Sequence, residues 1–307
     1  MPTALLIANP AASQFTGGLH RSAMRVLSRS HDVRPIWPQS AEHSRVAASE
    51  AAAGGVQLVI AMGGDGIVHH VAQGLIDSDS VLGIIPSGTT NVVARLLGIP
   101  NRPKDATKLL AEEYHVCAAP TVAVSASGPE GTWEARAVFS LGIGPDAAIV
   151  AVAETEPYRK YRFGSIHYAR TALGVVWSDL RSRKPDVAIS TPTERTGIGA
   201  MVQFHEAYTY FGRIPLRLDP DPPDPMSVLT IERLPMRRAG VIVRKAATGA
   251  LEDVKGMHLD RRVTEFTAET TNPVEVQMDG EHYGTVTSLT ARARPASLRI
   301  AVPRLRD

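Results

Sequence analysis

The first 100 residues alternate short apolar runs with helical patterns, and this alternation constrains the fold more than any other feature of the chain. A β-α-β-α order predicts a mostly parallel sheet with helices on both of its faces. In such a sheet, ligands bind at the carboxyl ends of the strands. The predicted strands are residues 4–8, 33–37, 57–62 and 81–85, and the predicted helices lie near 18–29, 42–53, 67–76 and 91–97.

The pattern changes after Pro120, where segments of period two alternate with Pro- and Gly-containing turns. This pattern favours a largely antiparallel second domain. We therefore expect an α/β fold plus a β fold: a three-layer α/β domain at residues 1–120 and a β-sandwich-like domain at 121–307, interrupted by a helix near 165–180. The domain assignment of the last residues, about 15 of them, is left open, because the chain could pass back to the first domain. The predicted strands of the second half include 121–124, 133–139, 201–204, 228–231, 274–278 and 298–302.

Length, charge and cysteine content narrow the class of protein. The 307 residues suggest about two domains. A net charge of +2, from 33 basic and 31 acidic residues, is far from the basic field of a dedicated nucleic-acid binder. The single Cys117 excludes an intramolecular disulfide and a Cys-based zinc site, and it suits a reducing compartment. No apolar run approaches the ~18 residues of a membrane span, so we expect a cytoplasmic protein.

A glycine-rich turn follows the third predicted strand. Gly63, Gly64, Asp65 and Gly66 come directly after the apolar run and directly before a helical pattern. Glycines there permit close backbone approach, so that successive N–H groups and a helix N-terminus can point at a phosphate. The turn is therefore a candidate phosphate cradle.

Asp65 is the unexpected member of this turn, because a carboxylate repels phosphates unless a magnesium ion, a water network or a donor intervenes. Its presence indicates a metal–nucleotide complex. The alternative is an ordinary strand-to-helix turn in which Asp65 caps the helix.

A second turn of the same kind follows the fourth predicted strand, at residues 86–91. Thr89 and Asn91 could offer a hydroxyl and an amide to a nucleotide at the same sheet edge. Alternatively, Asn91 only caps the next helix. Asn9 and Pro10 end the first strand, which adds a third loop at this edge.

These three loops together resemble the diacylglycerol kinase catalytic domain family of bacterial lipid kinases. The resemblance rests on Asn9–Ser13, Gly63–Gly66 and Pro86–Asn91, followed by Leu97–Pro100, and it continues in residues 139–147, 161–164 and 276–281. It covers nearly the whole chain in the family order.

The resemblance implies a nucleotide domain like that of NAD kinase and phosphofructokinase, with ATP and a lipid alcohol bound between two domains. ATP and Mg²⁺ are the expected cofactors. Ser40 stands where the family usually has Thr, which retains the hydroxyl. The expected nucleotide-binding residues are Asn9, Pro10, Ser13, Ser40, Gly63, Gly64, Asp65, Gly66, Ile67, Gly88, Thr89 and Asn91.

The resemblance also implies that Glu281 is the general base, with Asp279 and Gly280 forming the turn that aims it. Asp65 and Asp279 complete the expected catalytic set. Phosphoryl transfer needs little beyond positioning, charge neutralisation and a carboxylate near the nucleophile, which these residues can supply. The alternative is an ordinary hairpin between 274–278 and 282–288 with Glu281 in solvent.

Several residues depart from the family pattern. Ile67, His69 and His70 stand where the family has Thr, Asn and Glu, and Val92 replaces the usual Asp. We expect nucleotide binding to survive these changes better than the catalytic rate does.

The family also carries a structural magnesium site in its second domain, around an Asp-Asp-Gly-Leu-Leu turn. The matching segment of this chain is 221–228, where Asp224 is the plausible ligand beside the candidate Asp65 of the first domain.

Basic and aromatic residues cluster at 158–162, 181–184 and 237–238, near the helical pattern of 165–180. Such a face could rest on an anionic membrane, so peripheral contact with the inner face of the membrane is one expectation, and a solvated helix surface is the alternative. A homodimer is left open.

Three functions remain open at this point. The first is an ATP-dependent kinase that phosphorylates a lipid hydroxyl, either diacylglycerol or a sphingoid-type alcohol. The second is a NAD kinase-like enzyme with a soluble acceptor, which Asp279, Gly280 and Glu281 disfavour. The third is a nucleotide-binding regulator without catalysis, motivated by Ile67, His69 and Val92.

Overall fold

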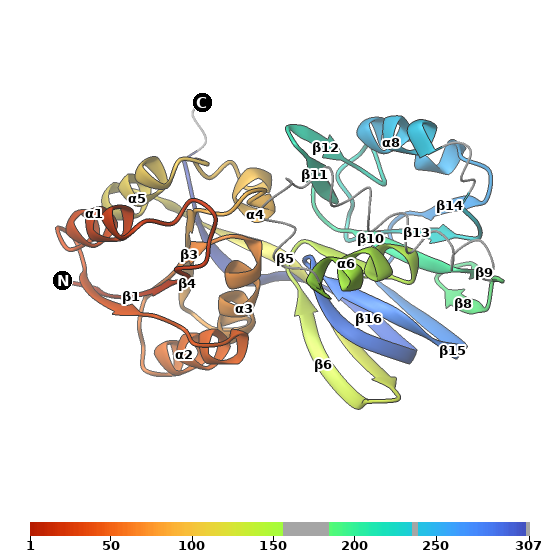
Figure 1. Ribbon diagram of the computed structural model, residues 1–307, viewed down its shortest axis with the longest axis horizontal. Coiled ribbons are helices and arrows are strands. Elements are labelled where there is room, and N and C mark those ends of the chain that lie inside the picture. Colours follow the sequence, from red (N-terminus) through yellow and green to blue (C-terminus); the bar gives the residue numbers. More distant parts are fainter. Residues whose placement is uncertain (156–183, 235–238, 305–307) are drawn as a thin grey trace. The chain divides into compact units, whose positions relative to one another are not determined.

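The computed structural model describes residues 1–155, 184–234 and 239–304 (Figure 1). The chain divides into two compact units. Met1–Thr121 and Arg294–Asp307 form the first unit, and Val122–Ala293 form the second.

The first unit is built on a parallel sheet with the strand order β2-β1-β3-β4, and the end of β16 pairs in parallel with β4. Apolar residues such as Leu6, Ile60 and Met62 are completely buried, as the continuous apolar runs predict for strands covered on both faces. The strands are β1 (Thr3–Ala8), β2 (Asp32–Ile36), β3 (Leu58–Gly63), β4 (Val81–Pro86) and β16 (Glu281–Val302).

Five helices complete three layers around this sheet. Helix α1 packs against α5, and α2 packs against α3. Figure 1 shows these two pairs on opposite faces of the sheet, so the predicted three-layer α/β fold is confirmed. The helices are α1 (Gly17–Leu27), α2 (Ala41–Ala53), α3 (Asp65–Leu75), α4 (Val92–Leu96) and α5 (Pro103–Glu112).

The second unit is dominated by antiparallel strands, as the period-two segments predict. Its main path runs β14-β13-β10-β7-β15-β16, while β5 pairs with β6 and β8 pairs with β9. The strands are β5 (His115–Gly128), β6 (Gly131–Ala137), β7 (Ser140–Ile143), β8 (Val187–Ser190), β9 (Glu194–Gly197), β10 (Gly199–Gln203), β13 (Ser227–Ile231), β14 (Met257–Asp260) and β15 (Glu265–Met278). The smaller elements are α6 (Pro145–Thr155), α8 (Ala239–Thr248), the 3-10 helix η2 (Leu251–Asp253) and a separate hairpin of β11 (Thr209–Phe211) and β12 (Ile214–Leu216).

Strand β15 pairs with two different strands, β8 and β7, on the side away from β16. Its first half pairs with β8, and its last residues pair with β7. The pairing register with β16 shifts between Glu269 and Val274, which is a β-bulge or irregularity. Bulges bend a strand, so one long strand can serve both arrangements. The core of this unit includes Val124, Phe266 and Leu289.

In the second half, one predicted strand is divided, and one predicted helix lies outside the described residues. The predicted strand 133–139 is divided in two, because β6 ends at Ala137 and β7 begins at Ser140. The helix near 165–180, the motif 161–164 and all three basic clusters, apart from Lys184, lie outside the described residues. Within the described ranges, no helix combines the length and the apolar character needed to cross a membrane.

Candidate active site

The strand order of the first unit creates a switch point between β1 and β3. The chain leaves β1 for β2 on one side, and then returns across β1 to place β3 on the other side. Loops at the carboxyl ends of two such strands run in opposite directions and leave a crevice, which is where open α/β sheets bind ligands. Asn9 follows β1 and Gly64 follows β3, so two of the three predicted loops lie at this point.

Close packing restricts two glycines of these loops, Gly88 and Gly63. A Cβ added to Gly88 would lie 2.5 Å from the Cα of Gly64, and one added to Gly63 would lie 2.5 Å from Cγ2 of Ile67. Real Cβ atoms do not approach other atoms so closely. The Ser87 N–H also donates to the Gly63 carbonyl at 2.8 Å. The loops after β3 and β4 therefore contact each other through their backbones.

The N-terminus of α3 lies directly after this contact. Gly64 is its N-cap in an extended conformation, and no side chain caps the first turn. The unsatisfied N–H groups and the helix dipole give this end a partial positive charge. Such an end is a ready anion-binding site, which is the property that the sequence assigned to the turn.

Asp65 connects two helices. It is the first residue of α3, and its Oδ1 accepts a hydrogen bond of 2.6 Å from the Val92 N–H at the start of α4. The capping alternative thus occurs in a modified form, because Asp65 caps α4, the helix that follows the next strand. A carboxylate that accepts at a helix N-terminus is also favoured by the helix dipole.

Asn91 is the N-cap residue of α4, but its side chain bonds the loop after β4. It lies in the left-handed region, with φ of 51°, and makes no side-chain cap bond to α4. Its Oδ1 accepts from the Gly88 N–H at 3.0 Å, and its Nδ2 donates to the Gly88 carbonyl at 3.1 Å and to Oδ1 of Asn101 at 2.8 Å. Asn91 therefore stabilises the backbone conformation of the loop that contains Gly88.

The remaining predicted contacts lie on the loops after β1, β2 and β4. The hydroxyls of Ser13 and Thr89 are 3.2 Å apart, which joins the first loop to the third. The Asn9 N–H donates to the Met62 carbonyl at 2.9 Å, whereas Pro10 is exposed. The Ser40 hydroxyl accepts from the His43 N–H at 3.0 Å and caps α2.

Two residues that the sequence reasoning missed also belong to these loops. Ser87 is completely buried, and its hydroxyl finds no hydrogen-bond partner among the described residues. The Gln14 side chain donates to the Gly88 carbonyl at 2.9 Å. Ile67 and His69, two departures from the family pattern, are buried in α3.

In the second unit, Asp279 is an anchor. Its side chain is only 2% exposed, and its carboxylate accepts from the N–H groups of Val138, Phe139 and Ser140 at 2.8, 2.7 and 2.9 Å. These bonds divert the backbone between β6 and β7, which explains the break in the predicted strand. This environment suits a residue that positions the turn.

Glu281 is the first residue of β16 and lies opposite Met278 in the hairpin with β15. The two loop residues, Asp279 and Gly280, have φ of 58° and 81°, as a tight primed turn requires. The hairpin considered as an alternative is therefore present. A hairpin also fixes the direction of Glu281, so its presence does not exclude a role as base.

A buried polar cluster supports this turn from the side. Gln277 accepts from the Gly280 N–H at 2.9 Å and donates to Asp146 and to Tyr208, both at 2.8 Å. The Tyr208 hydroxyl donates to Asp146 at 2.5 Å. Burial raises the pKa of the Asp146 carboxyl, and burial together with Asp146 raises the pKa of Tyr208 well above its ordinary value. One member of this cluster was indicated from sequence, because Asp146 lies in the family-like segment 139–147.

The residues present do not fit the structural magnesium site that the resemblance implies. Asp224 is exposed, and the described part of the chain contains no group of three or more His, Cys, Asp or Glu that could hold a metal ion. The neighbouring buried carboxylate, Asp219, already bonds Arg261.

Comparison with known proteins finds a family match in the first unit. The family model described as "Diacylglycerol kinase catalytic domain" matches residues 3–119. The matched segment is less than half of the chain and contains all three loops of the candidate site, which confirms the resemblance derived from sequence.

Curated relatives bear names of the same kind. A "Diacylglycerol kinase" of Mycobacterium tuberculosis is 37% identical over 96 residues, which are 31% of each chain. One of Bacillus subtilis is 54% identical over 56 residues, 18% of each chain. A "Probable lipid kinase YegS-like" of Xanthomonas oryzae is 32% identical over 148 residues, 46% of this chain and 45% of the relative. The chain therefore matches less than half the length of these relatives.

Solved structures extend the likeness to the whole fold. A diacylglycerol kinase of Bacillus anthracis superimposes with a TM-score of 0.66 at 20% identity, over 98% of this chain and 97% of its own. A yeast NADH kinase superimposes with a TM-score of 0.54 at 9% identity, over 98% and 83%. At such identities the likeness shows the fold alone: an α/β domain followed by a β-rich domain.

Proposed function

We propose that this protein is an ATP-dependent lipid kinase, which transfers the γ-phosphate of ATP to the hydroxyl of a lipid alcohol such as diacylglycerol or a sphingoid-type alcohol. The observation that carries the proposal is the uncapped N-terminus of α3 beside backbone-to-backbone glycine loops at the switch point of the sheet. The names of the relatives supply the substrate class.

The first unit holds the nucleotide in this proposal. Backbone N–H groups of Gly64, Asp65 and Gly66 bind phosphate oxygens at the start of α3, and the hydroxyls of Ser13 and Thr89 offer further hydrogen bonds. Asp65 would be the candidate ligand of the Mg²⁺ that accompanies ATP, which would supply positive charge beside the transferred group. The buried hydroxyl of Ser87, which has no hydrogen-bond partner in the described part of the chain, fits a site built to receive an oxygen-rich ligand.

Glu281 is the general base. It removes the proton of the lipid hydroxyl while that oxygen forms a bond to the γ-phosphorus, and the bond from the γ-phosphorus to the bridging oxygen of ADP breaks. Asp279 and Gln277 act as positioning residues, since their hydrogen bonds fix the turn that begins with Asp279 and ends at Glu281.

The departures from the family pattern affect the rate of phosphoryl transfer more than the binding of ATP. Ile67 removes a hydroxyl from the cradle, but the backbone N–H groups of the turn remain. We therefore expect ordinary ATP affinity with a low turnover.

Transfer of radiolabelled γ-phosphate distinguishes the candidate functions. The full chain is incubated with labelled ATP and Mg²⁺, and either with a panel of lipid alcohols in mixed micelles or with NAD. We expect label in a lipid product. Label in NAD would support the soluble-substrate alternative. A yeast NADH kinase has a similar fold. Tight ATP binding without transfer to any acceptor would support a regulator and overturn the proposal.

Replacement of Glu281 by Gln tests the assignment of the base. We expect Glu281→Gln to lower kcat by about 10²- to 10⁴-fold, the range for loss of general-base catalysis, without a change in ATP affinity. Glu265→Gln is the matched control, because Glu265 is an exposed carboxylate on the neighbouring strand. Unchanged turnover in Glu281→Gln would show that another group takes the proton.

A further inference from the structure

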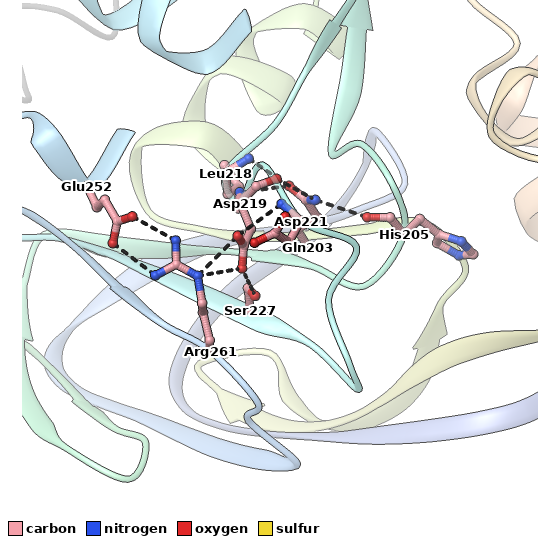
Figure 2. A network of polar contacts seen from close by, with 8 residues as sticks. All are labelled: Gln203, His205, Leu218, Asp219, Asp221, Ser227, Glu252 and Arg261. Atoms are coloured by element: carbon pink, nitrogen blue, oxygen red, sulfur yellow. Dashed lines mark hydrogen bonds and ion pairs between the residues drawn. The ribbon is translucent and has the colours of Figure 1, made fainter. Parts of the chain in front are cut away.

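Arg261 covers a buried carboxylate in the second unit (Figure 2). Asp219 is 2% exposed, and Nε of Arg261 lies 3.1 Å from its Oδ1 and 3.0 Å from its Oδ2. The Ser227 hydroxyl donates to Oδ2 at 2.7 Å, and the Asp221 N–H donates to Oδ1 at 3.3 Å. Both oxygens of this carboxylate are therefore bonded within the protein.

The same guanidinium binds a second acid. Nη1 and Nη2 of Arg261 donate to the two oxygens of Glu252 at 3.1 and 2.7 Å. Such a paired geometry is specific to arginine, because its planar fork matches a carboxylate. The hydrogen bonds to Glu252 and Asp219 raise the pKa of Arg261 further above its already high ordinary value, so its charge is permanent.

These contacts join three segments that are separate in the sequence. Asp219 lies in the loop between β12 and β13, Glu252 lies in η2 after α8, and Arg261 follows β14 directly. Gln203 of β10 holds the same loop by its backbone, since its Oε1 accepts from the Leu218 N–H at 2.6 Å and its Nε2 donates to the Asp219 carbonyl at 3.3 Å. Figure 2 shows these side chains converging on one loop.

A magnesium ion would need the same loop to supply oxygen ligands. Mg²⁺ demands near-octahedral coordination by about six oxygens at about 2.0–2.1 Å, usually with carboxylates among them. Here the buried carboxylate is bonded to a guanidinium instead, and Asp224 is exposed. The loop where the resemblance implies a structural cation thus already contains a cationic side chain.

We propose that Arg261 is the resident cation of this loop, and that it neutralises Asp219 and ties the loop to η2 in place of a bound divalent ion. The second unit then keeps this loop in place without metal. This proposal does not depend on the kinase activity, because any magnesium that accompanies ATP acts at the other site.

The first experiment compares the melting temperature of the full chain, without nucleotide, in EDTA, in Mg²⁺ and in Ca²⁺ by differential scanning fluorimetry and circular dichroism. We expect the three melting temperatures to agree within about 1 °C, because no ion that binds only the folded state is present to shift the equilibrium. A fall in EDTA that either ion reverses would overturn the proposal.

The second experiment removes the guanidinium. We expect Arg261→Gln to lower the melting temperature by about 4 °C or more, because it leaves a buried carboxylate without its counter-charge. Arg292→Gln is the matched control, since Arg292 makes the same paired contact with Glu265 but both side chains are about half exposed. We expect it to cost less than about 2 °C.

A double variant separates the neutralising role from simple packing. Asp219→Asn in the Arg261→Gln background removes the buried charge, so we expect the double variant to melt higher than Arg261→Gln alone. An Arg261→Gln variant that melts as Arg292→Gln does, or a double variant that melts below the single one, would contradict the role of Arg261 as a counter-ion. If Arg261→Gln does not fold, the ion series on the unmodified chain still decides the question.

Discussion

Two carboxylates of one turn have different environments at the residue scale. Asp279 is buried and bonds three backbone N–H groups, whereas Glu281, two positions later, is partly exposed. The sequence shows only that an acid, a glycine and an acid follow one another. Which acid is buried depends on residues 138–140, and the periodicity of the sequence does not bring that segment to the turn.

Asp279 therefore carries a prediction about stability. We expect Asp279→Ala to lower the free energy of unfolding by about 3–5 kcal/mol, because three buried N–H groups lose a charged acceptor. Equilibrium unfolding in urea measures this value. Glu281→Ala serves as the control on the same turn and should cost less than about 1 kcal/mol. Equal stability of both variants would mean that Asp279 does not anchor the turn.

His205 carries a prediction about pH. Its Nε2 donates to the Val138 carbonyl at 2.9 Å, and burial lowers its pKa below the ordinary value of 6.5. The unfolded chain therefore takes up a proton first as the pH falls, so the contribution of neutral His205 is complete above about pH 6.5 and is lost below it.

We expect the unfolding free energy of the unmodified chain to fall more steeply between about pH 6.5 and 5 than that of His205→Gln. Urea titrations at several pH values measure both slopes. The exposed His115→Gln is the control. Parallel curves for the unmodified chain and His205→Gln would contradict the assignment.

At the scale of elements, the loops after β3 and β4 behave as one piece. Gly88 lies against the backbone of Gly64, and the Asn91 side chain accepts a hydrogen bond from the Gly88 N–H. A side chain at position 88 must therefore push the loops apart and displace the start of α3.

We expect Gly88→Ala to weaken ATP binding by at least about tenfold, which corresponds to about 1.4 kcal/mol of binding free energy. Isothermal titration calorimetry on the full chain gives this value. Gly18→Ala in α1 is the control, because its added Cβ would meet nothing closer than 3.9 Å. Unaltered affinity in Gly88→Ala would exclude the contact of these loops from the nucleotide site.

The elements of the first unit could be predicted from sequence because each has a clear local signal. The strands and helices predicted within residues 4–97 all occur, with small shifts at their ends. Helix α5 was missed although Pro103 stands at its start, where proline is favoured. The candidate site was predicted as residue types at strand ends, but the role of Asn91 was not, because its bonds to Gly88 and Asn101 depend on a left-handed backbone.

At the scale of the whole molecule, the sequence predicted an α/β fold followed by a β-rich fold, and the structure has both. Strand partners were not predictable, because pairing joins residues far apart in the chain. Ile300 of β16 pairs with Leu82 of β4, and β15 pairs with β7 and β8 through different parts of its length. The contacts of Arg261 with Asp219 and Glu252 also join residues far apart in the chain, and no sequence motif predicts them.

The pairing of β16 with β4 has a consequence for synthesis on the ribosome. The segment that borders β4 is translated after the entire second unit, so the N-terminal sheet emerges with one edge unpaired while that unit is still being made. An unpaired apolar edge invites wrong partners, and chaperones shield such edges in nascent chains. Because of this order of translation, the edge at β4 stays without its second neighbour until the residues around Ile300 have been made.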